Sequence, residues 1–224
     1  MPTLKSVPPL AAGDRLSWDE FEARWEATAE IKFAELIGGR VYMPPPLSES
    51  HGESDGDVIT WTCVYASRTP GTKAVTNATC RILGDAPQPD VHLRIDDACG
   101  GQSRVRGKYL HGAPELVVEV CASSAGYDLH EKKDLYEAAG VLEYVAVLLH
   151  ESEVRWHRLE RRKYRLVRSA SGGIFKSSVF PGLWLNTPAL LNHDLRTVLA
   201  TLDVGLATPD HTAFVKALEA KRRG

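Results

Sequence analysis

The sequence predicts a mixed α/β fold in which helices flank a central β-sheet. Helix and strand signals alternate along the chain, in the order helix, hairpin, helix, strands, helix, strands and helices. The run Leu116–Cys121 is apolar at every position except Glu119, as expected of a central strand that is buried on both faces. The length of 224 residues suits one domain that buries its own hydrophobic core.

The first expected elements are a helix and a hairpin. Ser17 and Glu20 have the spacing of a capping box, in which each side chain binds the backbone of the other, so we expect a helix to begin at residue 18. Gly38-Gly39 separates Phe33–Ile37 from Arg40–Met43. A glycine pair supplies the positive φ angles of a two-residue turn, and these segments therefore predict a β-hairpin.

A longer helix and two strands follow. Apolar residues recur at helical spacing over residues 51–68. Strand signals return at 74–83 and at 90–95, with turn residues between them. Residues 96–107 are polar and rich in glycine, so we expect a loop there.

The second half of the chain predicts further strands and closing helices. Residues 123–139 indicate a turn and a helix that ends at Gly140, because glycine is the preferred residue just after a helix. We expect strands at 143–149, 153–159, 164–168 and 174–179. Helices are expected at 188–202 and 209–222, the first with an apolar stripe of Leu191, Leu195, Val198, Leu199 and Leu202.

This pattern divides the chain into three parts. Residues 1–16 are rich in proline, glycine and alanine and are expected to be a disordered lead. Residues 17–186 hold the alternating helix and strand signals and are expected to form the domain. Residues 187–224 are expected to be a C-terminal helical extension that packs on the same domain.

The charge balance limits the classes of nucleic-acid-binding protein. The net charge is -2, whereas proteins that coat DNA usually carry a strong basic excess. A nuclease is not excluded, because a bound metal ion supplies positive charge at the scissile phosphate. A local basic cluster leaves open a solvated hairpin face or a ribbon that faces nucleic acid: Arg155, Arg158, Arg161, Arg162, Lys163, Arg165 and Arg168.

Cysteine spacing and hydropathy bear on the compartment. Cys63, Cys80, Cys99 and Cys121 form no CxxC pair, which argues against a structural zinc site and a disulfide framework. We expect reduced cysteines in a cytoplasmic protein. No apolar run approaches the roughly 18 residues of a membrane span, and no signal-peptide pattern is present, so no membrane partner is expected.

Three acids are candidates for a chemical role. Glu119 falls within the buried run, where a lone carboxylate is costly unless it is paired or bound to a metal ion. Glu35 lies between apolar neighbours in the hairpin, and Asp90 follows Pro89 at the start of a predicted strand. Glu119 is also compatible with an exposed or salt-bridged strand end, and Pro89-Asp90 with an ordinary turn, since Pro-Asp is a common turn dipeptide.

One lysine lies on the face of a predicted helix. Asp128, Lys132 and Tyr136 are spaced by four residues, which places them along one side of a helix. The alternative for Lys132 is a solvated lysine paired with Asp128. Lys133 points about a quarter of a turn away and is the weaker candidate for a catalytic role.

Four segments together resemble the Uma-two family of restriction-endonuclease-like domains, part of the PD-(D/E)XK nuclease superfamily. They are AELIGGRVYMPPP with His51 beyond it, PDV (Pro89–Val91), GAPELVVEV (Gly112–Val120) and DLHEKKDLYEAAGVLEY (Asp128–Tyr144). PGLWL (Pro181–Leu185) fits the usual C-terminal strand of the family. The resemblance runs from about Ser17 to Leu185. It implies a restriction-endonuclease-like sheet flanked by helices, with an N-terminal helix and hairpin and with C-terminal helices.

The resemblance also implies a metal site. Asp90, Glu119 and the backbone carbonyl of Val120 become ligands of Mg²⁺, with Mn²⁺ as a substitute, and Glu35 becomes an additional acid of that site. Carboxylates and carbonyls are the oxygen ligands that such ions prefer. His51 lies where the family often has histidine, and either contacts a phosphate, lines the cleft or only begins a helix.

The catalytic lysine departs from the simplest pattern of the superfamily. That pattern places lysine two residues after the acid, where this chain has Cys121. The resemblance implies that Lys132, on the next helix, orients or activates the attacking water instead.

The implied activity is Mg²⁺-dependent hydrolysis of phosphodiester bonds in DNA by an endonuclease, in a protein that also forms a homodimer. The alternative is a binding or regulatory protein on the same fold with weak or absent catalysis. The acidic balance and the displaced lysine favour the second reading, whereas the retained acids and lysine favour the first.

Overall fold

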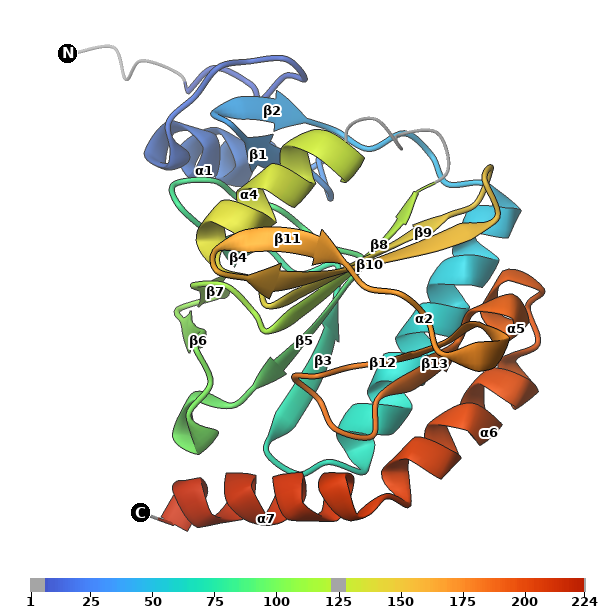
Figure 1. The fold of residues 1–224 in the computed structure, drawn as a ribbon. Helices are drawn as coiled ribbons and strands as arrows, with labels where there is room; N and C mark the ends of the chain where they lie inside the picture. The colour runs from blue at the N-terminus through green and yellow to red at the C-terminus, as the bar shows by residue number, and fades with distance from the viewer. Residues whose placement is uncertain (1–6, 122–127, 224) are drawn as a thin grey trace, which may run out of the picture.

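The computed structural model describes residues 7–121 and 128–223, and its centre is a six-stranded sheet (Figure 1). The strands stand in the order β11-β10-β9-β8-β5-β3, with β8 and β9 parallel and the other neighbours antiparallel. They are β3 (Thr72–Thr76), β5 (Val91–Ile95), β8 (Leu116–Cys121), β9 (Glu143–Leu148), β10 (Glu153–Glu160) and β11 (Lys163–Leu166). The mixed α/β class is confirmed, and β8 takes an inner position in the sheet as its apolar sequence predicted.

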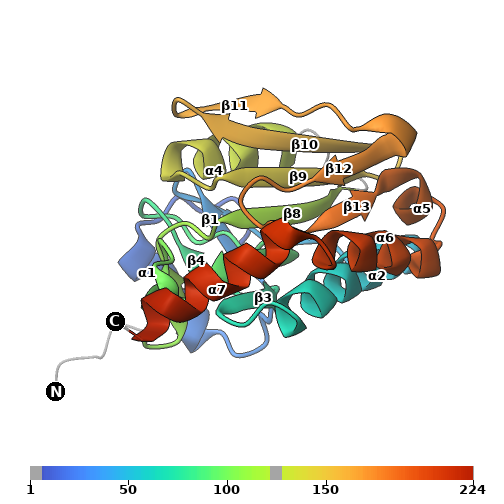
Figure 2. The ribbon, with the colours of Figure 1, turned by 60° about the horizontal axis from the view of Figure 1, so that its bottom comes forward.

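Helices cover both faces of the sheet; in Figure 2, α6 and α7 run in front of it and α4 lies behind. The helices are α1 (Trp18–Ala27), α2 (Glu49–Ser67), α4 (Lys133–Ala139), α5 (Thr187–Leu191), α6 (Leu195–Leu206) and α7 (Pro209–Arg223). Val58, Trp61 and Tyr65 of α2 pack in one core cluster with alternate residues of β8. Tyr136 of α4 packs with Val117 on the other face. Both faces of β8 are therefore buried.

Smaller sheets surround the central one in the described part of the chain. β1 (Glu35–Ile37) and β2 (Arg40–Tyr42) form a hairpin, and β12 (Ile174–Lys176) pairs with β13 (Trp184–Asn186). A third sheet has the order β4 (Cys80–Arg81), β7 (Tyr109–His111) and β6 (Arg104–Arg106). Short helical turns occur at η1 (Asp97–Cys99), η2 (Asp128–Lys132) and η3 (Ser171–Gly173).

Several local predictions are confirmed at the level of the backbone. Ser17 caps α1 through a complete capping box with Glu20. The turn between β1 and β2 has φ angles of 57° at Gly38 and 70° at Gly39, which non-glycine residues adopt only with strain. Gly140 caps the C-terminus of α4 in the left-handed conformation, with φ 89°.

Other expected elements are interrupted in the structure. The strand expected at 74–83 was wrong as one element, because Asn77 has φ 48° and turns the chain, so that β3 and β4 belong to different sheets. The loop expected at 96–107 contains η1 and β6. The helix expected at 188–202 breaks at His193, where φ is 55°, and Asp194 caps α6 separately. Part of the turn expected after residue 121 lies outside the described residues.

The N-terminal segment differs from the disordered lead that we expected for residues 1–16. From Val7 onward this segment is described, and Leu10 and Leu16 are buried in a cluster with Trp18 and Phe21. The amide of Gly13 donates to the carbonyl of Val41 in β2. Apolar burial and backbone hydrogen bonds therefore fasten this part of the lead to the hairpin, in spite of its proline- and glycine-rich composition.

Candidate functional site

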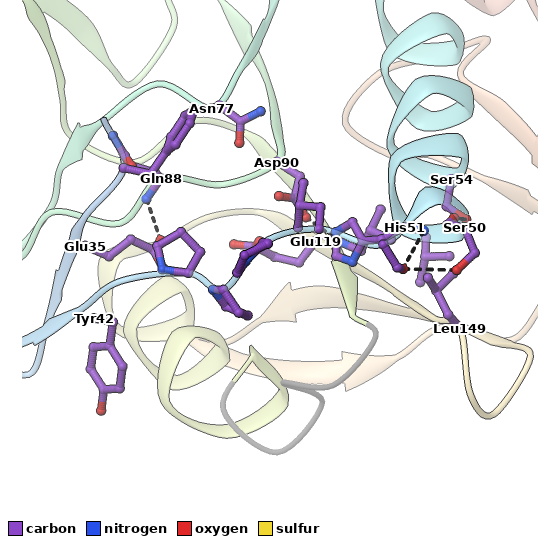
Figure 3. Close-up of a pocket in the computed structure, with 18 of the residues that line it drawn as sticks. Glu35, Tyr42, Ser50, His51, Ser54, Asn77, Gln88, Asp90, Glu119 and Leu149 are labelled. Carbon is purple, nitrogen blue, oxygen red and sulfur yellow. Dashed lines mark hydrogen bonds between the residues drawn. The ribbon is translucent and has the colours of Figure 1, made fainter. Parts of the chain in front are cut away.

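A cavity of about 1130 Å³ opens at the end of β8, bordered by the β1–β2 hairpin and the start of α2. Figure 3 shows Asp90, Glu119 and His51 near its centre. The lining contains every residue that the sequence nominated for the site: Glu35, His51, Asp90, Glu119, Val120 and Lys132. The fold therefore brings these residues together from the hairpin, α2, the position just before β5, β8 and the turn before α4.

Asp90 and Glu119 meet on one face of the sheet. The register of β5 and β8 pairs Val91 with Val118, so one further step places Asp90 opposite Glu119. Residues opposite each other in adjacent strands share a face. Asp90 does not continue the ladder: its Oδ2 accepts a hydrogen bond from the amide of Val120 at 2.7 Å. The two residues are therefore on the same face of the sheet, and both line the cavity at the end of β8.

The backbone carbonyl of Val120 points to the same side as Asp90. At the ends of the parallel pair β8–β9, the carbonyls of Glu115 and Cys121 accept from β9 amides, so the ladder uses the odd-numbered residues of β8. In a strand the amide and carbonyl of one residue point the same way, and neighbouring residues alternate. Because the Val120 amide donates to Asp90, its carbonyl also faces away from β9.

Lys132 joins the two glutamates. Its Nζ lies 2.8 Å from Oε1 of Glu119 and 3.0 Å from Oε1 of Glu35. Tyr136, one helical turn beyond Lys132, donates its hydroxyl to the same Oε1 of Glu119 at 2.7 Å. The amide of Gln88 donates to Glu35 at 2.7 Å. The side chain of Lys132 is only 4% exposed, so this is a buried ionic cluster rather than a solvated helix face.

On the α2 side of the cavity, the surroundings of Asp90 and Asp55 disfavour the ionised forms of their carboxylates. Burial raises the pKa of Asp90 to about 6; Lys132 and the Val120 amide oppose this rise, and nearby Asp55 adds to it. Burial likewise raises the pKa of Asp55 to about 6. An acid whose charged form is disfavoured in this way gains from a neighbouring cation.

The donor set fits a hard divalent cation. Asp90, Glu119 and Val120 all line the cavity, and they offer two carboxylates and a backbone carbonyl, oxygen donors of the kind that Mg²⁺ and Mn²⁺ take. Asp90 has a carboxylate whose ionised form is destabilised by burial and would be stabilised by such an ion. The candidate ligands are thus Asp90, Glu119 and Val120, with Glu35 held at the margin through Lys132.

His51 and Asp55 form a further group beside Asp90. Nε2 of His51 lies 3.5 Å from Oδ1 of Asp55, one turn along α2. Ligand atoms of His51, Asp55 and Asp90 all lie within 4.8 Å of one another. His51 was nominated from the sequence and lines the cavity, whereas Asp55 was missed. The available signal was the i, i+4 spacing of histidine and aspartate, which is common in surface helices.

Hydrogen bonds account for the positions of two more polar residues, Tyr136 and Glu115. Tyr136 was expected on the same helix face as Lys132, and its bond to Glu119 adds it to the site. Glu115 accepts hydrogen bonds from the amides of Ile95 and Gln102, each at 2.8 Å. Glu115 therefore fastens the loop after β5 and lies apart from the cavity lining.

A restriction-endonuclease-like protein is the class that this fold and this cluster define: an inner strand with a buried glutamate, an aspartate opposite it and a lysine from the following helix. The chain belongs to the Uma2 family, described as "Putative restriction endonuclease", whose model matches residues 18–188. The expected family is confirmed.

A solved structure supports the same fold. The chain is similar to a crystal structure titled as "a putative nuclease belonging to DUF820 from Anabaena variabilis ATCC 29413", with a TM-score of 0.60 and 14% identity. The similarity covers 80% of this chain and 98% of the other. No match was found among the curated proteins. Among the described residues, none of the helices has both the length and the apolar character that a bilayer crossing requires.

Proposed function

We propose that this protein is a Mg²⁺-dependent endonuclease that hydrolyses phosphodiester bonds in DNA. The observation that carries the proposal is the convergence of Asp90, Glu119 and Lys132 in one cavity, in a chain of the Uma2 family. When bound, a divalent ion supplies polarisation of the phosphate and a water of lowered pKa. Mn²⁺ is expected to substitute, because it accepts the same oxygen donors.

The side chains of the cluster have separate tasks in this proposal. Asp90 and Glu119, with the Val120 carbonyl, hold the ion at the end of β8. Lys132 places an ammonium beside Glu119, where it can orient the attacking water and stabilise charge that develops on the phosphate. Glu35 and Tyr136 position Lys132 and Glu119 through the contacts at 3.0 Å and 2.7 Å.

The cavity wall provides groups for a nucleic acid strand. Lys32, His51, His150 and His193 line it and can face phosphates. Phe33, also in the lining, has 53% of its surface exposed and offers a face on which a base can stack. These features support a nucleic acid substrate and, with the family, DNA as the first choice.

Assembly and location belong to the same proposal. We infer a homodimer in the cytoplasm from the family resemblance. The apolar stripe of α6 does not serve this inference, since Val198 and Leu202 are buried in the domain core. Light scattering at micromolar concentration tests the dimer, and a monomer there removes it.

A plasmid assay tests the activity. Wild type is expected to nick supercoiled DNA with Mg²⁺ or Mn²⁺, and Glu119→Gln and Lys132→Met to lose about 100-fold or more of the rate. Lys133→Met, one residue away, is the matched control and should keep the rate. A wild type that cuts neither DNA nor RNA with either ion removes the enzyme reading. A binding or regulatory protein would then be the better proposal, and the engagement of Lys132 by two glutamates favours it.

A further inference from the structure

The group of His51, Asp55 and Asp90 lies beside the metal site proposed above but draws two of its members from α2. His51 and Asp55 are one turn apart, and their side chains are 12% and 13% exposed. Both project toward Asp90, where donor atoms of all three residues lie within 4.8 Å of one another. The group therefore combines an imidazole with two carboxylates in a shielded position.

We propose that His51, Asp55 and Asp90 bind a second divalent ion, of the transition-metal type represented by Mn²⁺. Asp90 is shared with the site of Glu119 and Val120, so this inference extends the proposed function to a two-ion site. Oδ2 of Asp90 accepts from the Val120 amide, while Oδ1 accepts no hydrogen bond in the part of the chain that the structure describes. One carboxylate can thus serve ions on both sides.

The spacing of the donors suits an ion. Ligand atoms at about 2.1 Å from one octahedral ion lie roughly 3 Å apart when adjacent and about 4.2 Å apart when opposite. The donor atoms of the three residues lie within 4.8 Å of one another, close to this range, so small side-chain rotations bring them to coordination distance. The three residues come from a helix and from the start of a strand, and both elements belong to the packed core of the domain.

The alternative to a metal site is an ordinary ion pair between His51 and Asp55 on one helix. The nearby pair of His193 and Asp57 serves as a comparison. Nδ1 of His193 lies 3.0 Å from Oδ2 of Asp57, within hydrogen-bond distance. Nε2 of His51 is 3.5 Å from Oδ1 of Asp55, and this oxygen is buried and has no hydrogen-bond partner among the residues that the structure describes. An unsatisfied buried carboxylate oxygen is costly, and a bound cation satisfies it.

The ligand types select the kind of ion. Imidazole nitrogen is a good ligand for first-row transition metals such as Zn²⁺, whereas Mg²⁺ and Ca²⁺ prefer oxygen donors throughout; Mn²⁺ favours oxygen donors but accepts imidazole beside carboxylates. The site of Asp90, Glu119 and Val120 offers oxygen donors only. The two neighbouring sites therefore differ in preference, and the His51 site should favour the transition metals.

Pulsed electron paramagnetic resonance of the full chain loaded with Mn²⁺ tests the proposal. A histidine ligand produces hyperfine coupling between the Mn²⁺ electron spin and imidazole nitrogen, which a carboxylate site does not. We expect this coupling in wild type, its loss in His51→Gln, and its retention in Glu119→Gln. Asp57→Asn is the matched control: Asp57 is on the same helix as His51 but pairs with His193, so this variant should keep the coupling.

A second measurement guards against variants that fail to fold. Calorimetric titration with Mn²⁺ should show one fewer bound equivalent for Asp55→Asn than for wild type. Wild type without imidazole coupling at saturation, or coupling that persists in His51→Gln, overturns the proposal. If the coupling follows the expected pattern while the protein cuts no nucleic acid, the second site stands and the nuclease proposal fails, so the two results are separable.

Discussion

The ammonium of Lys132 lies 2.8 Å from Oε1 of Glu119, and both side chains are almost entirely buried. Glu119 belongs to the inner strand β8, and Lys132 ends the turn η2 just before α4. Each charge is tolerated in the interior because the other is present. The same contact holds a candidate catalytic lysine against a candidate metal ligand, so stability and chemistry depend on one pair.

Replacement of Lys132 should destabilise the fold, because two buried glutamates then lack their cation. In Lys132→Met, Glu35 and Glu119 lose their shared cation, and we expect the free energy of unfolding to fall by about 3 kcal/mol without metal. A divalent ion can replace the lost charge, so Mn²⁺ should raise the melting temperature of the variant more than that of wild type. Differential scanning calorimetry with and without Mn²⁺ measures both effects.

Lys133→Met is the control for that experiment. Lys133 is half-buried and, in the described part of the chain, takes no part in the ion pairs of Glu35 and Glu119, so its removal should lower the unfolding free energy much less than Lys132→Met does. Equal losses in the two variants would mean that the charge of Lys132 has no special partner in the folded protein.

Tyr136 should contribute through its hydroxyl. Its hydrogen bond to Glu119 has a charged acceptor, and removal in Tyr136→Phe should lower the unfolding free energy by about 2 kcal/mol. Tyr164→Phe removes a bond to the neutral carbonyl of Val141 and should cost about 1 kcal/mol. Urea denaturation of the two variants supplies the comparison. The reverse order of the two losses would contradict the assignment of Tyr136 to the ionic cluster.

The acid sensitivity of the fold should depend on His92. Burial, with a smaller effect of Arg94, lowers the pKa of His92 from 6.5 to about 4. The unfolded chain therefore binds a proton at a pH where the folded protein does not, and stability falls as the pH decreases through this window. Between pH 7 and pH 5 we expect His92 to remove about 2 kcal/mol of unfolding free energy.

A neutral variant isolates this contribution of His92. Asp55 and Asp90, whose pKa values are raised to about 6, act in the opposite direction over the same pH range, so the net curve of wild type is not diagnostic. The side chain in His92→Phe does not titrate. Wild type should therefore lose about 2 kcal/mol of unfolding free energy relative to this variant between pH 7 and pH 5. A difference that stays constant in urea denaturation at both values would refute the role of His92.

The predictability of the fold from sequence depended on how local each signal was. The capping box of Ser17, the Gly38-Gly39 turn and the run Leu116–Cys121 act over a few residues, and the corresponding elements form where they were expected. The break at Asn77 needed a left-handed residue that the strand-like composition concealed. Leu10 and Leu16 are held by distant partners, which composition alone cannot indicate.

In the site too, local signals were predictable from the sequence, whereas contacts between distant residues were not. Glu119 stood out because it interrupts a buried strand, and family resemblance grouped it with Asp90, Glu35 and Lys132. The bond from the Val120 amide to Asp90 depends on the strand register, and no single segment encodes it. Asp55 lies on a helix whose orientation against the sheet comes only from core packing, so its approach to Asp90 was not predictable from its spacing to His51.

Neutralisation of Asp90 should separate folding from metal binding. In Asp90→Asn, the side-chain carbonyl can still accept from the Val120 amide, while the buried charge disappears. The pKa of Asp90 is raised from 3.8 to about 6, so its ionisation lowers stability as the pH rises through this interval. Without metal at pH 7, the variant should therefore equal wild type or exceed it by up to about 2 kcal/mol, since Asp90 keeps some exposure.

With divalent ions, wild type should become more stable than Asp90→Asn. Wild type at a Mn²⁺ concentration about 100 times the dissociation constant gains about 2.7 kcal/mol by mass action, and Asp90→Asn should lose most of this gain because both proposed sites contain Asp90. Asp85→Asn is the contrasting control: Asp85 accepts from the amides of Gly38 and Gly39, so its neutralisation should destabilise the protein and leave the Mn²⁺ gain intact. Thermal melts of the three proteins at several Mn²⁺ concentrations decide the matter. An undiminished Mn²⁺ gain in Asp90→Asn would show that the ion binds elsewhere, because a ligand stabilises only the state whose donors it contacts.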